Sequence, residues 1–434
     1  MKFIFHGAAK EVGRSCIELI TQKNRFLFDS GIKLKSITES DVVEENKQQE
    51  VEYPTWVNDL EKINAVFLSH AHLDHSGALP MFNHFGLECP IFATQATAAT
   101  SDILLKDSYK IESLIKKMEY GKGNIKRIQN LIQFVNYKIR YTMPNSDVHY
   151  TYFDAGHIPG SSSVLLETEG KRILYSGDIN FIDTNLMKQA DTNYGEVDIL
   201  ITESTYGDRE HTDRKETENE LIESINEGLK KGPVLLPTFA VGRAQELIIM
   251  LAEKVDAPIY VDGMASSITK MYMNYGNFIK DFNEFKNAIS KVEFVQDSMQ
   301  RRDLMKQKGV FITTAGMLDG GPIIDYLKTL WNNKDCSLFL TGYQAEHSNG
   351  RMLLNKGRLM LENREVEFRG KFRQFDLSAH TGLTGLKNFI KKINPKKLII
   401  NHGDAPAEDN LKQYAESLGI ETYEPELDDR IEIN

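Results

Sequence analysis

Residues 69–77 read Ser69-His70-Ala71-His72-Leu73-Asp74-His75-Ser76-Gly77, which places three histidines and one aspartate within six positions. The apolar run at 63–68 predicts a buried strand, and residues 77–82 predict a helix that begins near Asp74. Side chains two apart on an extended segment share a face, so His70 and His72 project together. Asp74 and His75 follow at the turn and can aim at a second point nearby. The stretch therefore predicts two metal ions in one pocket, with ligands that suit zinc, rather than a polar loop with incidental histidines.

The composition is that of a globular protein. The chain has 434 residues, enough for two domains, with 41% hydrophobic and 26% charged residues. No apolar run approaches a membrane span, and the apolar segment after Met1 is too short for a signal peptide, so we expect a cytoplasmic protein. Three widely spaced cysteines (Cys16, Cys89 and Cys336) predict reduced thiols rather than a disulfide framework. The net charge of -10 disfavours a broad nucleic-acid-coating surface, but it leaves room for a metal-containing phosphate site.

Several predicted strands end in an acid or a histidine. Asp29, Asp178 and Glu203 each follow an apolar run, and His157 lies in a Gly/Pro loop after the strand predicted at 148–154. Asp29 is either a turn residue or a carboxylate that orients a metal-binding histidine. Asp178 is either a turn aspartate or a carboxylate that bridges two metal ions. Because ligands commonly bind at the carboxyl ends of strands in α/β folds, we expect these residues to converge on one site.

Strands and helices alternate regularly between about Asp208 and residue 340, which predicts a small parallel-sheet domain with helices on both faces. Its strand ends carry glycines, hydroxyl groups and Arg243. Backbone amides at such loops bind phosphate, and an arginine can clamp a phosphate with two hydrogen bonds. The alternative is that these are ordinary α/β turns. The candidate phosphate-binding residues are Thr238, Arg243, Gly316, Thr341 and Tyr343.

Two further histidines, His380 and His402, follow predicted strands near the end of the sequence. With them, the chain resembles the β-CASP branch of the metallo-β-lactamase superfamily. That branch includes ribonuclease J and the nuclease subunit of the cleavage and polyadenylation specificity factor. Residues 238–246, 316–322 and 341–346 match the latter more closely. The motifs that carry the resemblance are, in order, Asp29, the cluster at 70–75, His157, Asp178, Glu203, His380 and His402.

The resemblance implies a fold and a division into domains. The expected fold is an α/β fold, a metallo-β-lactamase αββα sandwich with an inserted β-CASP α/β domain. Residues 1–207 would form the first part of the sandwich, 208–365 the β-CASP domain, and 366–434 the second part of the sandwich. The regular alternation of strands and helices predicted from about Asp208 agrees with this division.

The resemblance also implies a set of metal ligands for two Zn²⁺ ions per chain. His70, His72 and His157 would hold one ion. Asp74, His75 and His402 would hold the other. Asp178 would bridge the two ions, and Asp29 would lie behind the ligands and orient them. Sites of this composition also accept manganese, so zinc is the expected metal by inference from the family.

The implied activity is hydrolysis of phosphodiester bonds in single-stranded RNA, because RNA-cleaving members carry a histidine at the position of His402. The expected catalytic residues are His380 as general acid, Glu203 as the carboxylate that orients it, and Asp74. Both endonuclease and 5′→3′ exonuclease modes fit this site. A homodimer or an RNA-processing or decay complex also fits, and no membrane partner is expected. The alternatives are a non-catalytic scaffold subunit and a small-molecule metallohydrolase, but the full motif set and the insertion disfavour both.

Overall fold

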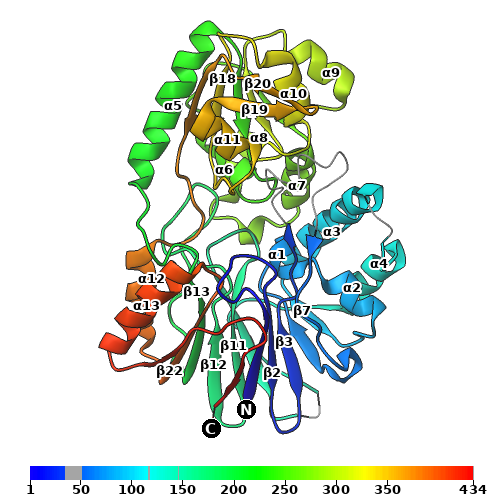
Figure 1. Cartoon of the computed structure of the whole chain (residues 1–434), viewed down its shortest axis with the longest axis vertical. Helices are drawn as coiled ribbons and strands as arrows, with labels where there is room; N and C mark the ends of the chain where they lie inside the picture. The colour runs from blue at the N-terminus through cyan, green and yellow to red at the C-terminus, as the bar shows by residue number, and fades with distance from the viewer. Residues whose placement is uncertain (35–50, 116–117, 145, 434) are drawn as a thin grey trace.

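The computed structural model of the chain describes residues 1–34, 51–115, 118–144 and 146–433. Two seven-stranded mixed sheets pack face to face in the lower half of Figure 1, and a six-stranded sheet occupies the upper half. The structure thus confirms the predicted αββα sandwich with an inserted α/β domain. No helix within the described ranges is long and apolar enough to cross a membrane.

The first sheet of the sandwich has antiparallel strands on one side and parallel strands on the other. Its strand at the beginning of the chain pairs with the strand near the end, with Lys2 opposite Glu432 and Ile4 opposite Arg430. The two ends of the chain therefore lie side by side (Figure 1). The order of this sheet is β24 (Arg430–Glu432), β1 (Lys2–Gly7), β2 (Cys16–Ile20), β3 (Arg25–Phe28), β6 (Ala65–Phe67), β7 (Ile91–Ala93) and β8 (Ile132–Phe134).

The second sheet is likewise mixed, with its first four strands parallel and the others antiparallel. Its order is β23 (Glu421–Tyr423), β22 (Lys397–Asn401), β13 (Ile199–Glu203), β12 (Lys171–Tyr175), β11 (Ser162–Thr168), β10 (His149–Asp154) and β9 (Arg140–Thr142). A short hairpin of β4 (Lys33–Leu34) and β5 (Val51–Glu52) lies apart from both sheets.

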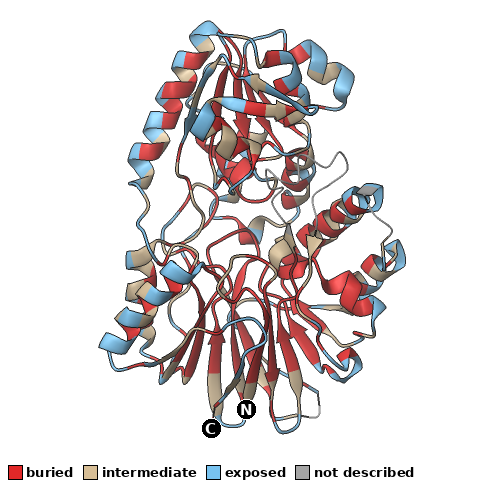
Figure 2. Cartoon of the chain, in the orientation of Figure 1, coloured by how far each residue is buried: buried red, intermediate tan, exposed pale blue. Residues whose placement is uncertain are grey.

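Apolar side chains fill the space between the two sheets. Phe5, Phe28 and Phe67 come from the first sheet, and Tyr152 and Ile201 come from the second, all fully buried in one cluster. The inner strands of both sheets are accordingly mostly buried in Figure 2, whereas edge strands such as β8 and β9 are partly exposed. Helices cover the outer faces: α1 (Leu73–Ser76), α2 (Leu79–His84), α3 (Gln95–Ile115) and α4 (Lys122–Leu131) on one side, and α12 (Leu383–Ile393) and α13 (Ala405–Ser417) on the other.

The inserted sheet is parallel throughout. Its last strand lies beyond residue 365, where we expected the sandwich to resume, because it pairs with β18. The domain limits at 207/208 and 365/366 stay predictions. The order of this sheet is β16 (Val292–Phe294), β15 (Ile259–Asp262), β17 (Val310–Thr313), β14 (Val234–Pro237), β18 (Ser337–Leu340) and β21 (Lys371–Gln374).

Helices lie on both faces of the inserted sheet, as predicted. Alternate side chains of β14 point to opposite faces, so Val234 and Leu236 join one apolar cluster and Leu235 joins another. The first cluster includes α5 (Arg214–Lys231), α6 (Arg243–Leu251), α7 (Met264–Tyr272) and α8 (Phe282–Ile289). The second includes α9 (Ser298–Leu304), α10 (Ile323–Leu330), α11 (Asn349–Lys356) and the hairpin β19 (Arg358–Leu361) and β20 (Arg364–Glu367).

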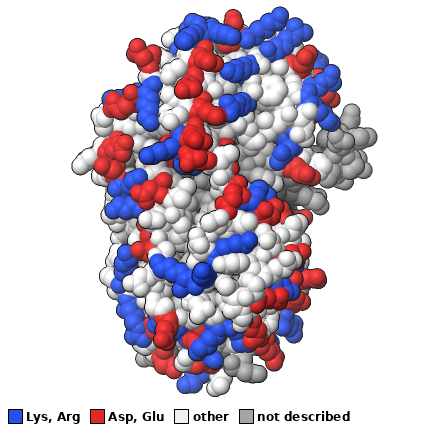
Figure 3. Space-filling view, turned by 90° about the vertical axis from the view of Figure 1, so that its left-hand side faces the viewer, with Lys and Arg blue, Asp and Glu red and all other residues white. Residues whose placement is uncertain are grey.

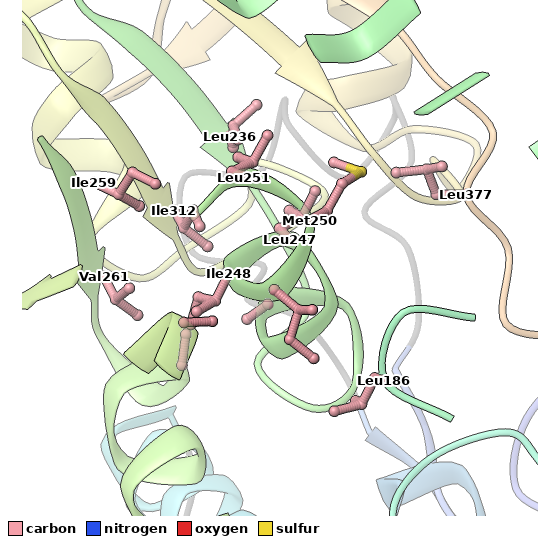
Figure 4. Packing of buried hydrophobic residues seen from close by; sticks show 14 of the residues in the cluster. Leu186, Leu236, Leu247, Ile248, Met250, Leu251, Ile259, Val261, Ile312 and Leu377 are labelled. Carbon is pink, nitrogen blue, oxygen red and sulfur yellow. The ribbon is translucent and has the colours of Figure 1, made fainter. Parts of the chain in front are cut away.

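The insert and the sandwich share a continuous apolar contact. Leu247 and Ile248 of α6 belong to the same buried cluster as Leu186, which precedes β13, and Leu377, which follows β21 (Figure 4). Ile158, beside the predicted ligand His157, belongs to this cluster too. The carboxyl ends of the insert's strands are therefore held close to the strand ends of the sandwich.

Candidate metal centre

The predicted metal ligands lie together where strands of both sandwich sheets end. His70 follows β6, Asp178 follows β12 and His402 follows β22. Asp29 and His402 have φ angles of 59° and 56°, so the chain turns sharply where β3 and β22 end. The two sheets meet along this edge, which brings side chains from distant parts of the sequence into contact.

The first cluster consists of His70, His72 and His157, with Asp178 beside them. His72 Nδ1 lies 3.2 Å from His70 Nε2 and 3.2 Å from His157 Nε2. In a tetrahedral zinc site with bonds of about 2.0–2.1 Å, two ligand nitrogens lie about 3.4 Å apart. The three nitrogens are thus spaced to share one zinc ion, which supports this part of the predicted ligand set.

The outer nitrogens of these histidines are held by hydrogen bonds. His157 Nδ1 donates to the carbonyl of Ala379 over 2.9 Å. His70 Nδ1 donates to Ser69 Oγ over 3.0 Å, since that hydroxyl itself donates to Asp29. These bonds assign the proton to Nδ1, so the Nε2 lone pairs of His70 and His157 point to the centre.

The second cluster consists of Asp74, His75 and His402. Asp74 Oδ2 lies 3.6 Å from His402 Nε2 and 3.9 Å from His75 Nε2. His75 and His402 are buried, whereas the Asp74 side chain is 33% exposed. The centre is therefore open on the side of Asp74, where a substrate can approach.

Asp178 lies between the two clusters and is 2% exposed. Its Oδ2 faces the first cluster, 3.5 Å from His70 Nε2 and 3.7 Å from His157 Nε2. Its Oδ1 faces the second, 3.3 Å from His75 Nε2 and 3.5 Å from His402 Nδ1. Oδ1 and His75 Nε2 are both buried without a hydrogen-bond partner in the described chain. Two buried polar atoms of this kind fit a metal ion between them, and the bridging role of Asp178 stays a prediction.

Asp29 forms the base of the centre and is completely buried. Its carboxylate accepts hydrogen bonds from the Ser69 amide (2.7 Å), Ser69 Oγ (2.6 Å), His75 Nδ1 (2.7 Å) and Tyr175 Oη (2.7 Å). The bond to His75 keeps the Nε2 of that ring free for a metal ion. The sequence pointed to Asp29 but missed Tyr175, whose signal in the sequence is a tyrosine at the end of β12, after Ile173 and Leu174.

Replacing Asp29 by asparagine is expected to weaken metal binding by about 10- to 100-fold, because an amide cannot accept bonds from His75, Ser69 and Tyr175 together. Competition with a chromogenic chelator measures this affinity. Asp303→Asn, at a side chain that is 70% exposed on α9, is the matched control and should bind metal like the parent. Equal affinities for Asp29→Asn and the parent would mean that Asp29 does not position the ligands.

Burial sets the protonation of the first cluster. It holds the pKa of His70 and of His157 well below the ordinary value, and the charge of a neighbouring histidine lowers each of them further. Metal ions bind the neutral imidazole, so these two side chains are in the binding form at neutral pH without losing a proton.

His380 and Glu203 lie at the edge of the first cluster. His380 Nδ1 donates to Glu203 Oε2 over 2.9 Å, which leaves Nε2 facing the centre, 3.9 Å from Asp178 Oδ2. Glu203 also accepts from the Ile179 amide over 2.7 Å, so its carboxylate is held in place. Glu203, His380 and Asp178 are also close enough to hold a metal ion themselves. The geometry thus suits a general acid oriented by a carboxylate.

A second histidine–carboxylate pair, not considered from the sequence, lies next to His380. His211 Nδ1 donates to Asp376 Oδ2 over 2.8 Å. The ring of Tyr206 lies 4.3 Å from that of His211 and 6.1 Å from that of His380. Tyr206 lies three residues after Glu203, the last residue of β13, and this position is the sequence signal for the pair.

The structure brings the candidate phosphate-binding residues to neighbouring loops at the carboxyl ends of β14, β17 and β18. Arg243 is buried and pairs with Glu246, three residues along α6. Thr238 and Thr341 are buried too, whereas Tyr343 is 48% exposed. Their contacts with RNA stay predictions.

Three family models match this chain. They are a metallo-beta-lactamase superfamily domain over residues 22–205, a Beta-Casp domain over 244–353 and a Zn-dependent metallo-hydrolase RNA specificity domain over 365–425. The last of these covers both His380 and His402.

Several archaeal proteins are similar along most of the chain. "Probable RNase MJ4" of Methanocaldococcus jannaschii is 41% identical over the whole of both chains. "RNase aCSPSF2" of Saccharolobus solfataricus is 32% identical, over 97% of this chain and 83% of its own length. "Transcription termination factor FttA" of Methanothermobacter thermautotrophicus is 30% identical, over 92% of this chain and 66% of its own length.

A solved structure from Enterococcus faecalis V583, of a protein of unknown function, superposes with a TM-score of 0.62 at 14% sequence identity. The match covers 99% of both chains. At this identity the likeness supports the fold alone.

Proposed function

The chain belongs to the β-CASP family of metallo-β-lactamase proteins, and on that premise we propose that it is a metal-dependent ribonuclease that cleaves single-stranded RNA. The observation that carries the proposal is Asp178, whose two oxygens face two histidine clusters beside the His380–Glu203 pair. The match to an RNA specificity domain and the relatives named as RNases support RNA as the substrate.

The residues present fit two zinc ions per chain. His70, His72 and His157 would hold one ion, Asp74, His75 and His402 the other, and Asp178 both. When bound, such a metal pair activates water near neutral pH and neutralises charge that develops on the phosphate. The protein's own part is to orient the ligand nitrogens, which Asp29, Ser69 and the Ala379 carbonyl do by hydrogen bonding to the opposite nitrogen of each ring.

His380 would donate a proton to the leaving oxygen of the cleaved bond. Glu203 holds the Nδ1 side of the ring, so Nε2 is the atom that carries the transferred proton. Burial lowers the pKa of His380, but the charges of Glu203 and Asp178 and the hydrogen bond to Glu203 outweigh it and raise the pKa to about 9. The ring is then in the acid form at neutral pH, as a general acid requires.

Glu203→Gln is expected to move the alkaline limb of the cleavage rate to lower pH. A general acid is active below its pKa, and removing the charge of Glu203 lowers the pKa of His380 toward its usual value near 6.5. Single-turnover rates between pH 5.5 and 10, with metal content checked at each pH, measure the shift. An unchanged alkaline limb with normal metal content would show that Glu203 does not act on the proton donor.

The test of the proposed function uses one unstructured RNA labelled at either end, with a 5′ monophosphate or a 5′ triphosphate, and protein of known metal content. Internal fragments that do not depend on the 5′ group would indicate an endonuclease. Mononucleotides released only from the monophosphate form would indicate a 5′→3′ exonuclease. Absence of cleavage with the metal sites filled would overturn the proposal in favour of a scaffold subunit.

A further inference from the structure

Three loops at the carboxyl ends of the parallel strands β17, β14 and β18 pack against one another through glycines. A Cβ on Gly316 would lie 3.1 Å from the backbone nitrogen of Phe239, so these two loops meet backbone to backbone. A Cβ on Gly342 would lie 2.9 Å from Cε2 of Phe239, so the Phe239 ring rests directly on Gly342. The ring is thus supported on one side.

The loops present two aromatic side chains to solvent. Phe239 is 38% exposed and Tyr343, next to Gly342, is 48% exposed. No ring–ring or cation–π contact within the described ranges involves either of them. The exposed part of each side chain adds nothing to the folding energy, because it stays in contact with water.

These rings border the metal centre. Tyr343 follows Gly342, on which the Phe239 ring rests, so the two rings lie on adjoining loops. On the other side, a Cβ on Gly242 would lie 2.9 Å from Cγ2 of Ile158, the neighbour of His157. The loop 238–242 therefore lies against the segment that carries the predicted ligand His157, and Tyr343 lies on the loop that packs against it.

Two charged side chains next to these loops are engaged internally. Arg243 pairs with Glu246, and Arg351 Nη2 donates to the Gln344 carbonyl over 2.7 Å. The hydroxyl of Thr238 donates to the Phe239 carbonyl over 3.3 Å, and the Thr341 hydroxyl is completely buried, without a hydrogen-bond partner in the described part of the chain. What the loops offer a ligand is consequently aromatic surface rather than a cluster of cations.

The outer surface of the insert along α5 is a poor alternative site for RNA binding. Exposed glutamates follow one another along α5 at positions 216, 220, 223 and 227. Figure 3 shows acidic side chains running down the upper half of this face, with basic side chains scattered around them. Glu220 pairs with Arg373 and Glu227 with Lys371, but the row of glutamates still disfavours a phosphate backbone along α5.

We infer that Phe239 and Tyr343 form a base-stacking subsite, which holds unpaired nucleobases of the RNA beside the cleaved bond. The inference rests on the proposed ribonuclease function, and it explains why the substrate would be single-stranded. Every nucleobase presents a flat face that stacks on an aromatic ring, so the subsite accepts any sequence. Bases in a duplex are already stacked and paired, so a double helix cannot occupy it.

Binding of a fluorescent, unstructured 12-nucleotide RNA, followed by anisotropy, tests the inference. His380→Ala serves as the parent because it should bind RNA without cutting it. Adding Phe239→Ala or Tyr343→Ala should raise the Kd by about 5- to 150-fold, the range expected for loss of one base–aromatic stack. Tyr343→Phe and Phe239→Trp keep a ring and should bind like the parent.

A set of RNAs with one abasic nucleotide at each position locates the contact. For each ring, one abasic position should weaken RNA binding by the parent. The same abasic position should cause no further loss in the variant that lacks that ring, Phe239→Ala or Tyr343→Ala. Phe85→Ala is the matched control. Phe85 is 39% exposed and lies between α2 and β7, at the opposite end of the sheet from the ligands. Equal effects of every abasic position on parent and variants would overturn the stacking subsite.

The outcomes separate the two proposals. RNA cleavage by the natural protein, with no change in Kd for either alanine variant, overturns the stacking subsite and leaves the ribonuclease in place. If the abasic positions and the alanine variants weaken binding as described but the protein never cleaves RNA, the stacking subsite is supported and the proposed ribonuclease function is overturned. A protein that neither binds nor cleaves RNA overturns both.

Discussion

Replacing His380 by alanine is expected to lower RNA cleavage by about 10²- to 10⁴-fold while the metal content per chain stays the same. The imidazole is held by Glu203 through Nδ1 and faces the centre through Nε2, so alanine removes the proton donor. The first cluster keeps its three histidines and Asp178 in this variant. Single-turnover cleavage together with elemental analysis of the purified protein gives both quantities.

This variant also decides between two roles for His380. Asp178, Glu203 and His380 are themselves close enough to hold a metal ion. If His380 were a ligand, its loss would lower the metal content in step with the activity. His211→Ala is the control, because it removes a neighbouring imidazole that is 16% exposed and bound to Asp376. It should leave metal content unchanged, so a loss of metal confined to His380→Ala would contradict the role of proton donor.

Asp178→Asn is expected to lower both metal content and cleavage, the latter by at least roughly 1,000-fold, since metal assistance contributes several kcal/mol to such reactions. Each oxygen of Asp178 faces histidines of one cluster, and asparagine keeps the shape but removes the charge. Asparagine also replaces one of the two oxygens by an amide group that cannot bind a cation. Metal titration and single-turnover cleavage measure the two effects.

Asp74→Asn provides the comparison within the same centre. Asp74 is partly exposed and belongs to the second cluster alone, so its loss should affect one metal ion rather than two. Full metal content and full activity in Asp178→Asn would refute the bridging role. Loss of a single ion in both variants would place Asp178 in one cluster only.

Much of the fold could be predicted because its signals are local. Apolar runs such as 63–68 and the one before Glu203 indicated buried strands, and regular alternation of strands and helices after Asp208 indicated the parallel insert, which the structure confirms. The position of β21 could not be predicted in this way. Residues 371–374 form the edge of the insert only because β18 lies next to them, a pairing across more than thirty positions that no local pattern encodes.

For the centre, the sequence by itself determined the kinds of ligand and their local spacing. Histidines two apart on an extended segment share a face whatever surrounds them, and family motifs extended the set to Asp178, His380 and His402. Only the tertiary structure decided which atoms meet. The two oxygens of Asp178 face two clusters, Tyr175 reaches Asp29, and Arg243 turns inward to Glu246 while Phe239 stays exposed. The physical reason is that side-chain types and local periodicity are properties of short segments. Hydrogen-bond partners, burial and exposure depend instead on segments that folding brings together from distant parts of the chain.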